Sequence, residues 1–140
     1  MPCEHVLIAE DEKGLQVTLG LLLRQENYRV SVASNGYEAY NTILSLHKTL
    51  SAVDLLVSDL HATLREGDEL LASLKNSGIP IPVIILTEYA ESAWTDRQPD
   101  TPLTRYITKP FEPQLLLDSI REILDQHKSA IQPEKIKQRR

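Results

Sequence analysis

The sequence predicts an α/β fold with a doubly wound, five-stranded parallel sheet in the order 2-1-3-4-5. Three observations support this fold class. Five short apolar segments are each followed by a segment with helical or helix-like spacing, which is typical of parallel strands joined by right-handed crossovers. The central segments are apolar almost throughout, as in strands buried on both faces. Polar residues follow the strands, at the edge where open sheets of this class bind ligands.

The predicted strands are short, and the first and third end in carboxylates. The first strand, His5–Ala9, is followed by Glu10 and Asp11, and the third strand, Val53–Asp59, has its own aspartate as the last residue. The second alternates between apolar and polar residues, which is typical of an edge strand. The second, fourth and fifth strands are expected over 29–33, 81–86 and 103–107.

Helical periodicity fills most of the intervals between these strands. Leu15, Leu19, Leu22 and Leu23 form one apolar stripe of a helix expected over about 12–26. A weak stripe with prolines at its end predicts a short or irregular helix over 88–102. Three further helices are predicted. One is marked by Ala39, Ile43, Leu44 and Leu46, with Ser34 or Asn35 as its cap, and another by Leu70, Leu71 and Leu74 before Gly78. The last begins at about Glu112 and is marked by Leu115, Leu116, Ile120, Ile123 and Leu124.

Composition and charge restrict the class of protein. The chain has 140 residues, 41% of them hydrophobic and 25% charged, which suits one globular domain, and no apolar run reaches the roughly 20 residues of a membrane span. The net charge is −5; residues 125–140 carry +3, so the rest carries −8 and is poorly suited to nucleic acid. A single cysteine favours a reducing cytoplasm. We expect a domain over 1–126 and a tail or linker over 127–140.

Five polar side chains are expected to converge at one edge of the sheet: Glu10, Asp11, Asp59, Thr87 and Lys109. Crowded carboxylates raise one another's pKa unless a cation lies among them. A site made of oxygen ligands favours a hard ion, and phosphate chemistry favours Mg²⁺. A lysine and a hydroxyl beside it suit a transferred anionic group. The set therefore predicts phosphoryl transfer onto a carboxylate.

Over roughly residues 4–126 the sequence resembles the receiver domain of bacterial two-component response regulators. The matching features, in chain order, are Glu10-Asp11, Asp59, Gly67, Thr87 and the segment 106–111, Tyr-Ile-Thr-Lys-Pro-Phe. The resemblance implies a flavodoxin-like, chemotaxis-regulator-like three-layer sandwich and a phosphorelay signalling role. It also implies a sensor histidine kinase or phosphotransfer protein as partner, a downstream target or output domain, and no contact of this domain with nucleic acid or membrane.

The resemblance also implies a role for each matching residue. Asp59 would be the phosphoacceptor, taking the phosphoryl group of a phosphohistidine. Mg²⁺ would be bound by Asp11, by Asp59 and by the backbone carbonyl of His61, with Glu10 acting through water. The protein would then be a stoichiometric phosphoacceptor and not an enzyme, apart from self-phosphorylation and autodephosphorylation.

The fourth and fifth strands would supply the switch. Thr87 and Lys109 would bind phosphoryl oxygens, and Tyr106 would turn inward on activation together with Thr87. The resemblance further implies a cis peptide between Lys109 and Pro110, which an X-Pro bond accommodates at low cost.

Other functions remain open at this point. Thr63 and Glu88 stand where the family usually has a proline and a small residue, which suggests a receiver-like interaction domain that works without phosphorylation. An aspartyl-phosphate phosphohydrolase on the same fold is less favoured, because Leu60 and His61 follow Asp59 in place of a second catalytic acid. Taken alone, Asp59 also fits a turn. The chain is expected to be either a single-domain regulator or a receiver from a longer protein, and a homodimer is left open.

Overall fold

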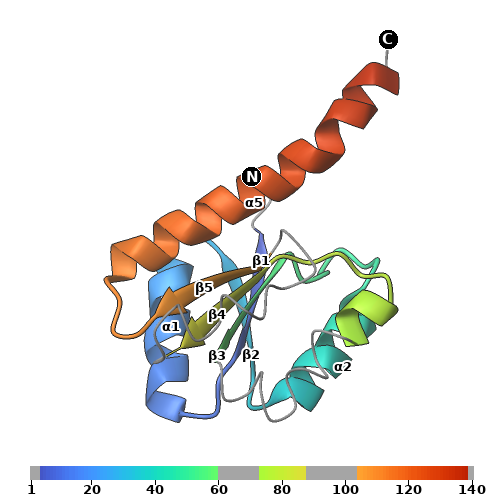
Figure 1. The fold of residues 1–140 in the computed structure, drawn as a ribbon. Coiled ribbons are helices and arrows are strands. Elements are labelled where there is room, and N and C mark those ends of the chain that lie inside the picture. Colours follow the sequence, from blue (N-terminus) through green and yellow to red (C-terminus); the bar gives the residue numbers. More distant parts are fainter. Residues whose placement is uncertain (1–3, 60–72, 88–103, 139–140) are drawn as a thin grey trace, which may run out of the picture.

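In the computed structural model, five parallel strands form one sheet in the predicted order β2-β1-β3-β4-β5 (Figure 1). The structure describes residues 4–59, 73–87 and 104–138, with side chains described up to His127. The first two strands match their predicted bounds, and β3 and β4 each begin two residues later than expected. The strands are β1 His5–Ala9, β2 Arg29–Ala33, β3 Leu55–Asp59, β4 Val83–Thr87 and β5 Thr104–Thr108.

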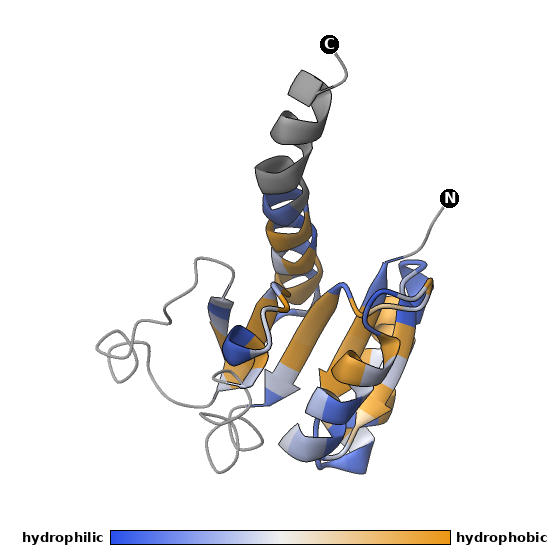
Figure 2. Ribbon diagram, turned by 90° about the vertical axis from the view of Figure 1, so that its right-hand side faces the viewer, coloured by the Kyte–Doolittle hydropathy of each residue, from blue (hydrophilic) through white to orange (hydrophobic). Residues whose placement is uncertain are grey.

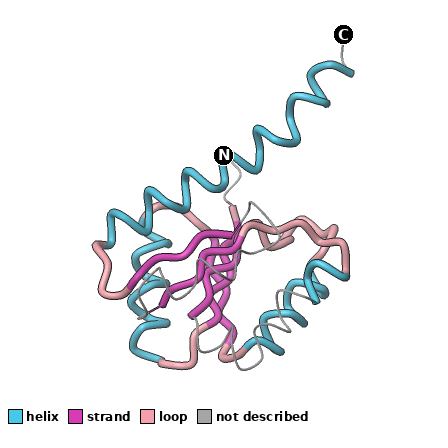
Figure 3. The backbone as a smooth tube through the Cα atoms, viewed as in Figure 1, coloured by secondary structure: helices cyan, strands magenta, loops and turns pink. Residues whose placement is uncertain are grey.

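Helices cover both faces of the sheet, which gives the three-layer arrangement (Figure 1, Figure 3). Helix α1, Lys13–Gln25, and helix α5, Pro113–Gln138, lie on one face. Helix α2, Gly36–Leu46, lies on the other face. Residues 73–76 are also helical, and Leu74 packs on the α2 side. For the crossovers whose helices are described, α1 lies on one face and α2 on the other, as the doubly wound fold predicts.

Alternate strand residues supply two apolar cores, because successive side chains of a strand point to opposite faces. Val6, Ile8 and Ile84 pack under α1 and α5, whereas Leu7, Leu56 and Ile85 pack under α2. All six are at most 1% exposed, and each such side chain contributes on the order of 1.5–3 kcal/mol of hydrophobic stabilisation. Figure 2 shows the apolar strands enclosed between the helices. A rigid sheet therefore supports the loops at its edge.

Polar side chains and left-handed residues fix the ends of the helices. The Asn35 side chain accepts a hydrogen bond from the Glu38 amide at 2.9 Å, so Asn35, and not Ser34, is the N-cap of α2. Asn27 ends α1 with a φ of 68°, and Gly78 ends the helical turn at 73–76 with a φ of 71°. Both ends carry the paired backbone hydrogen bonds of a Schellman motif.

One expectation about the apolar stripes of the helices needs correction. Leu44 and Leu115 were placed on apolar stripes, but they are 42% and 50% exposed, because each lies one residue away from the buried face of its helix. Helix α5 runs through Pro133 to Gln138, so a large part of the expected tail has a helical backbone that projects beyond the sheet (Figure 1).

Several predicted features lie outside the described residues. They are the helix expected over 88–102, the backbone carbonyl of His61, and Leu60, Thr63, Gly67 and Glu88. Within the part of the chain that is described, no helix combines the length and the apolar composition of a bilayer span.

Candidate functional site

Three carboxylates meet at the C-terminal edge of the sheet. Glu10 and Asp11 follow β1, and Asp59 is the last residue of β3, the strand that pairs with β1. One carboxylate oxygen from each residue lies within 4.8 Å of the other two. Glu10 and Asp59 are only 3% and 4% exposed, whereas Asp11 is exposed. The cluster is thus buried on the protein side and open on one side, through Asp11.

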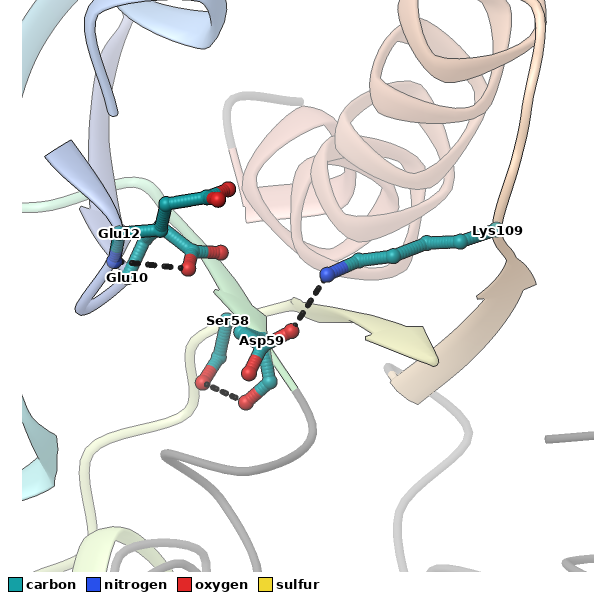
Figure 4. Close-up of polar contacts among 5 residues, drawn as sticks. All are labelled: Glu10, Glu12, Ser58, Asp59 and Lys109. Atoms are coloured by element: carbon teal, nitrogen blue, oxygen red, sulfur yellow. Dashed lines mark hydrogen bonds and ion pairs between the residues drawn. The ribbon is translucent and has the colours of Figure 1, made fainter. Parts of the chain in front are cut away.

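A lysine reaches the same point from the far side of β4. Lys109 follows β5, and its Nζ lies 2.6 Å from Asp59 Oδ1 (Figure 4). The backbone amide of Lys109 donates to the carbonyl of Thr87 at 2.6 Å, which ties this loop to the end of β4. The peptide between Lys109 and Pro110 is cis, as the resemblance implied. Asp59 therefore has carboxylates on one side and a cation on the other.

Glu10 lies in the least favourable electrostatic environment of the cluster. The pKa of Glu10 is raised from 4.5 to about 7, mainly by burial and also by the negative charge of Asp59, against the opposing effect of Lys109. Glu10 Oε2 accepts a hydrogen bond from the Glu12 amide at 3.1 Å, which favours the charged form. The other oxygen, Oε1, is buried and has no hydrogen-bond partner among the described residues. Such an oxygen suits a bound cation or its water ligands.

Thr87 and Tyr106 occupy the strands on the other side of Asp59. Thr87 is 2% exposed and is the last residue of β4. Tyr106 lies in β5 opposite Ile85 and packs, half-buried, against the core on the α2 side. Arg105 points to the α5 side instead, where its guanidinium contacts Glu122 at 2.8 Å. Tyr106 is therefore on the sheet face opposite to α5.

Sequence reasoning missed two residues that hold Glu10 in place. The Glu12 amide donates to its side chain, and the side-chain amide of Gln16 donates to its backbone carbonyl. The only signal in the sequence is the position of Gln16 in the first turn of α1, from which a glutamine can reach back over the helix N-terminus.

An apolar groove of about 640 Å³ lies next to the acidic site, between α1 and the start of α5. Lys109 belongs to both, because it lines the groove and also contacts Asp59. The same helix also exposes two apolar side chains that do not line the groove, because Val17 and Leu21 are 60% and 56% exposed. The groove is lined by Leu15, Thr18, Leu19, Leu22, Lys109, Pro110, Phe111 and Pro113.

Residues 6–121 match the family model described as "response regulator receiver domain". The transcriptional regulatory protein GlrR of Escherichia coli is 32% identical over 122 residues, which cover 87% of this chain and 26% of that protein. The transcriptional regulatory protein PdtaR of Mycobacterium tuberculosis is 32% identical over 117 residues, covering 83% of this chain and 54% of that protein. The chain thus spans between about a quarter and about half of the length of these two relatives.

Solved structures share the fold. A CheY-like response regulator receiver domain protein from Methanospirillum hungatei superposes with a TM-score of 0.75 at 25% identity, covering 91% of this chain and 98% of that one. The chemotaxis protein CheY4 of Vibrio cholerae gives a TM-score of 0.71 at 21% identity, covering 86% and 98% of the two chains. The second likeness supports the fold alone.

Proposed function

Because the chain belongs to the response regulator receiver family of two-component signalling, we propose that it takes up a phosphoryl group on Asp59 and thereby switches a protein-interaction surface. One observation carries this proposal. Asp59 is a 4% exposed carboxylate that contacts Lys109 on one side and lies within 4.8 Å of the oxygens of Glu10 and Asp11. This arrangement suits a nucleophile that must work beside a highly charged group.

The proposed reaction needs little from the protein beyond position and charge. An oxygen of Asp59 attacks the phosphorus of a phosphohistidine on a partner protein. An O–P bond forms, the N–P bond breaks, and the released imidazole takes up a proton from solvent. Lys109, which contacts Asp59 before the reaction, then pairs with a phosphoryl oxygen. Each phosphoryl group modifies one protein molecule, so we propose a stoichiometric acceptor and not a turnover enzyme, apart from self-phosphorylation and autodephosphorylation.

The acidic cluster fits Mg²⁺. Its ligands are carboxylate oxygens, and Glu10 contributes a buried oxygen without a partner among the described residues. We assign Asp11 and Asp59 as direct ligands, with the His61 carbonyl, and Glu10 as a ligand through water. When bound, the ion supplies positive charge that offsets the charge of the phosphoryl oxygens.

Thr87 and Tyr106 are the proposed switch. Thr87 ends the strand next to Asp59, which supports the proposal that its hydroxyl binds a phosphoryl oxygen. Tyr106 is half-buried on the neighbouring strand, where it can change its exposure when Thr87 moves. Phosphorylation would thus shift the equilibrium between two arrangements of this edge of the sheet.

The groove between α1 and α5 is the proposed contact surface for the kinase or phosphotransfer protein. It shares Lys109 with the acidic site, so a protein seated in it is close to Asp59. The acidic body and the signalling role favour a cytoplasmic location and protein partners. Since the relatives are longer transcriptional regulators, the output is proposed to act through a further domain or a separate protein target.

The test is phosphorylation without a partner protein. The purified protein is incubated with Mg²⁺ and acetyl phosphate, and the intact mass is measured. We expect a gain of one phosphoryl group in the wild type and in Asp118→Asn, an exposed aspartate of α5, and no gain in Asp59→Asn. Beryllium fluoride, a phosphoryl mimic, should bind only where Asp59 is intact.

The other outcomes identify the alternatives. A protein that neither gains mass nor binds Mg²⁺ would be an interaction domain that works without phosphorylation. Repeated hydrolysis of a phosphate metabolite would identify a phosphohydrolase. A mass gain that persists in Asp59→Asn would place the modification at another residue.

A further inference from the structure

The outer carboxylate of the acidic cluster lacks the packing that fixes the other two. Glu10 and Asp59 are buried in the edge of the sheet, but Asp11 is exposed on the loop between β1 and α1. Core contacts therefore do little to hold the Asp11 side chain. Its direction depends mainly on the peptide that joins Glu10 to Asp11.

Hydrogen bonds hold the backbone on both sides of the Glu10 Cα. On the N-terminal side, the Glu10 amide, which belongs to the preceding peptide, donates to the carbonyl of Ala33 at 3.0 Å and ties the chain to β2. On the C-terminal side, the carbonyl of the peptide that joins Glu10 to Asp11 accepts a hydrogen bond from Nε2 of Gln16. Because a peptide unit is planar, fixing this carbonyl also fixes the Asp11 nitrogen, from which the Asp11 side chain is built.

Gln16 is well placed to hold this carbonyl. It is half-buried in the first full turn of α1, and its own amide donates to the Glu12 carbonyl at 3.0 Å, so the helix sets where its side chain starts. The other hydrogen bonds described for Glu10, from the Glu12 amide and to the Ala33 carbonyl, use backbone groups of these partners. A substitution of the Gln16 side chain therefore removes the hydrogen bond to the Glu10 carbonyl and leaves these backbone bonds in place.

We propose that Gln16 is a positioning residue of the acidic site: by holding the Glu10 carbonyl, it keeps the Asp11 carboxylate facing Glu10 and Asp59 and so sets the affinity for Mg²⁺. This inference rests on the proposed function, because it assumes that the cluster binds this ion. Gln16 itself touches neither the ion nor the phosphoryl group. Its effect is on affinity and not on the attack by Asp59.

The test compares Gln16→Met with the wild type. Methionine has a similar length but no N–H to donate. Mg²⁺ affinity is measured by titration calorimetry, and the thermal midpoint is measured with and without the ion. We expect Mg²⁺ binding to weaken on the order of tenfold, as for other residues that orient metal ligands, with little change in the metal-free midpoint. The control is Gln25→Met, at the far end of α1, which should bind Mg²⁺ with the affinity of the wild type.

A second readout separates affinity from chemistry. At saturating Mg²⁺, Gln16→Met should be phosphorylated by acetyl phosphate at the wild-type rate, because only occupancy is reduced. Gln16→Asn, whose amide is one methylene too short, should behave like the methionine variant.

Wild-type Mg²⁺ affinity in both variants would overturn the role of Gln16 and leave the proposed function intact. A phosphorylation rate of Gln16→Met that stays below the wild-type rate at saturating Mg²⁺ would also overturn the role of Gln16. A wild-type protein that does not bind Mg²⁺ would overturn the proposed function and this inference together.

Discussion

The side chain of Glu10 is buried, and its Oε1 has no hydrogen-bond partner among the described residues. A charged carboxylate in this position costs stability when no cation is present. The same burial raises the pKa of Glu10 to about 7. The folded protein therefore binds this proton more tightly than the unfolded chain does, and the cost is greatest at high pH.

This predicts that Glu10→Gln stabilises the metal-free protein. At pH 8 the free energy of unfolding should rise by about 1–2 kcal/mol, because the amide removes a buried charge. As the pH falls through 7 towards 4.5, wild-type Glu10 becomes protonated and the advantage of the variant should disappear. Urea unfolding in EDTA at pH 8, 7, 6 and 5 measures the difference.

The matched control is Glu12→Gln, an exposed neighbour in the same loop. It should show no comparable dependence on pH. An advantage of Glu10→Gln that is as large at pH 5 as at pH 8 would mean that packing, and not charge, is responsible.

At the residue scale, the sequence predicted which side chains converge but not how they are held. Glu10, Asp11, Asp59, Thr87 and Lys109 follow directly from the ends of the predicted strands. The direct contact between Lys109 and Asp59 depends on the path of the loop after β5. Gln16 was missed because a glutamine in the first turn of a helix is ordinarily a solvated residue, and its contact with Glu10 depends on the angle at which α1 leaves the sheet.

Among the elements, helix α2 has an N-terminus that side chains fix. The Asn35 side chain accepts from the Glu38 amide, and the Glu38 carboxylate accepts from the Ser34 amide at 2.8 Å. Two backbone donors are thereby satisfied at the helix start. Because α2 buries Ala39 and Ile43 against the sheet, fraying at this end would also loosen the core on that side.

We predict that Asn35→Ala lowers the free energy of unfolding by about 1 kcal/mol, the usual loss for an N-cap. Asn41→Ala, an exposed position within the same helix, should leave stability unchanged or raise it slightly, because alanine favours the helix interior. Urea unfolding of the two variants measures the change in the free energy of unfolding relative to the wild type. Equal stability of both variants would show that Asn35 does not act as a cap.

At the element scale, the strand order and the positions of α1, α2 and α5 were predicted well because the apolar period differs between strands and helices. The ends of the helices were predicted less well. The cap of α2 was open between Ser34 and Asn35, since both residue types accept such bonds. The sequence left open how far α5 continues past Pro133, because proline removes a backbone donor from a helix interior.

For the molecule as a whole, the acidic site and the apolar groove share one edge. α1 starts at the acidic loop and lines the groove with Leu15, Leu19 and Leu22. The same helix exposes Val17 and Leu21. The sequence predicted the buried stripe of α1 but not the groove, which forms only when the loop after β5 lies against the helix. A partner that binds here would contact apolar side chains next to Asp59.

This arrangement predicts that Leu21→Arg separates the two sources of phosphoryl groups. Autophosphorylated histidine kinases from the source organism are first screened to find the one that transfers fastest to the wild type. Transfer from that kinase to Leu21→Arg should fall on the order of tenfold, because a charge replaces an apolar contact at the interface. Phosphorylation by acetyl phosphate, which needs no docking surface, should be unchanged.

Leu44→Arg is the matched control for this prediction. Leu44 is also an exposed leucine on a helix, but α2 lies on the opposite face of the sheet. Transfer to Leu44→Arg should therefore equal transfer to the wild type. Equal loss in both variants would indicate a general effect of the added charge, and no loss in Leu21→Arg would place the kinase on another surface. Selective loss in Leu21→Arg would assign kinase docking to α1, because both substitutions add the same charge to an exposed helix position and only Leu21 lies on the helix that lines the groove.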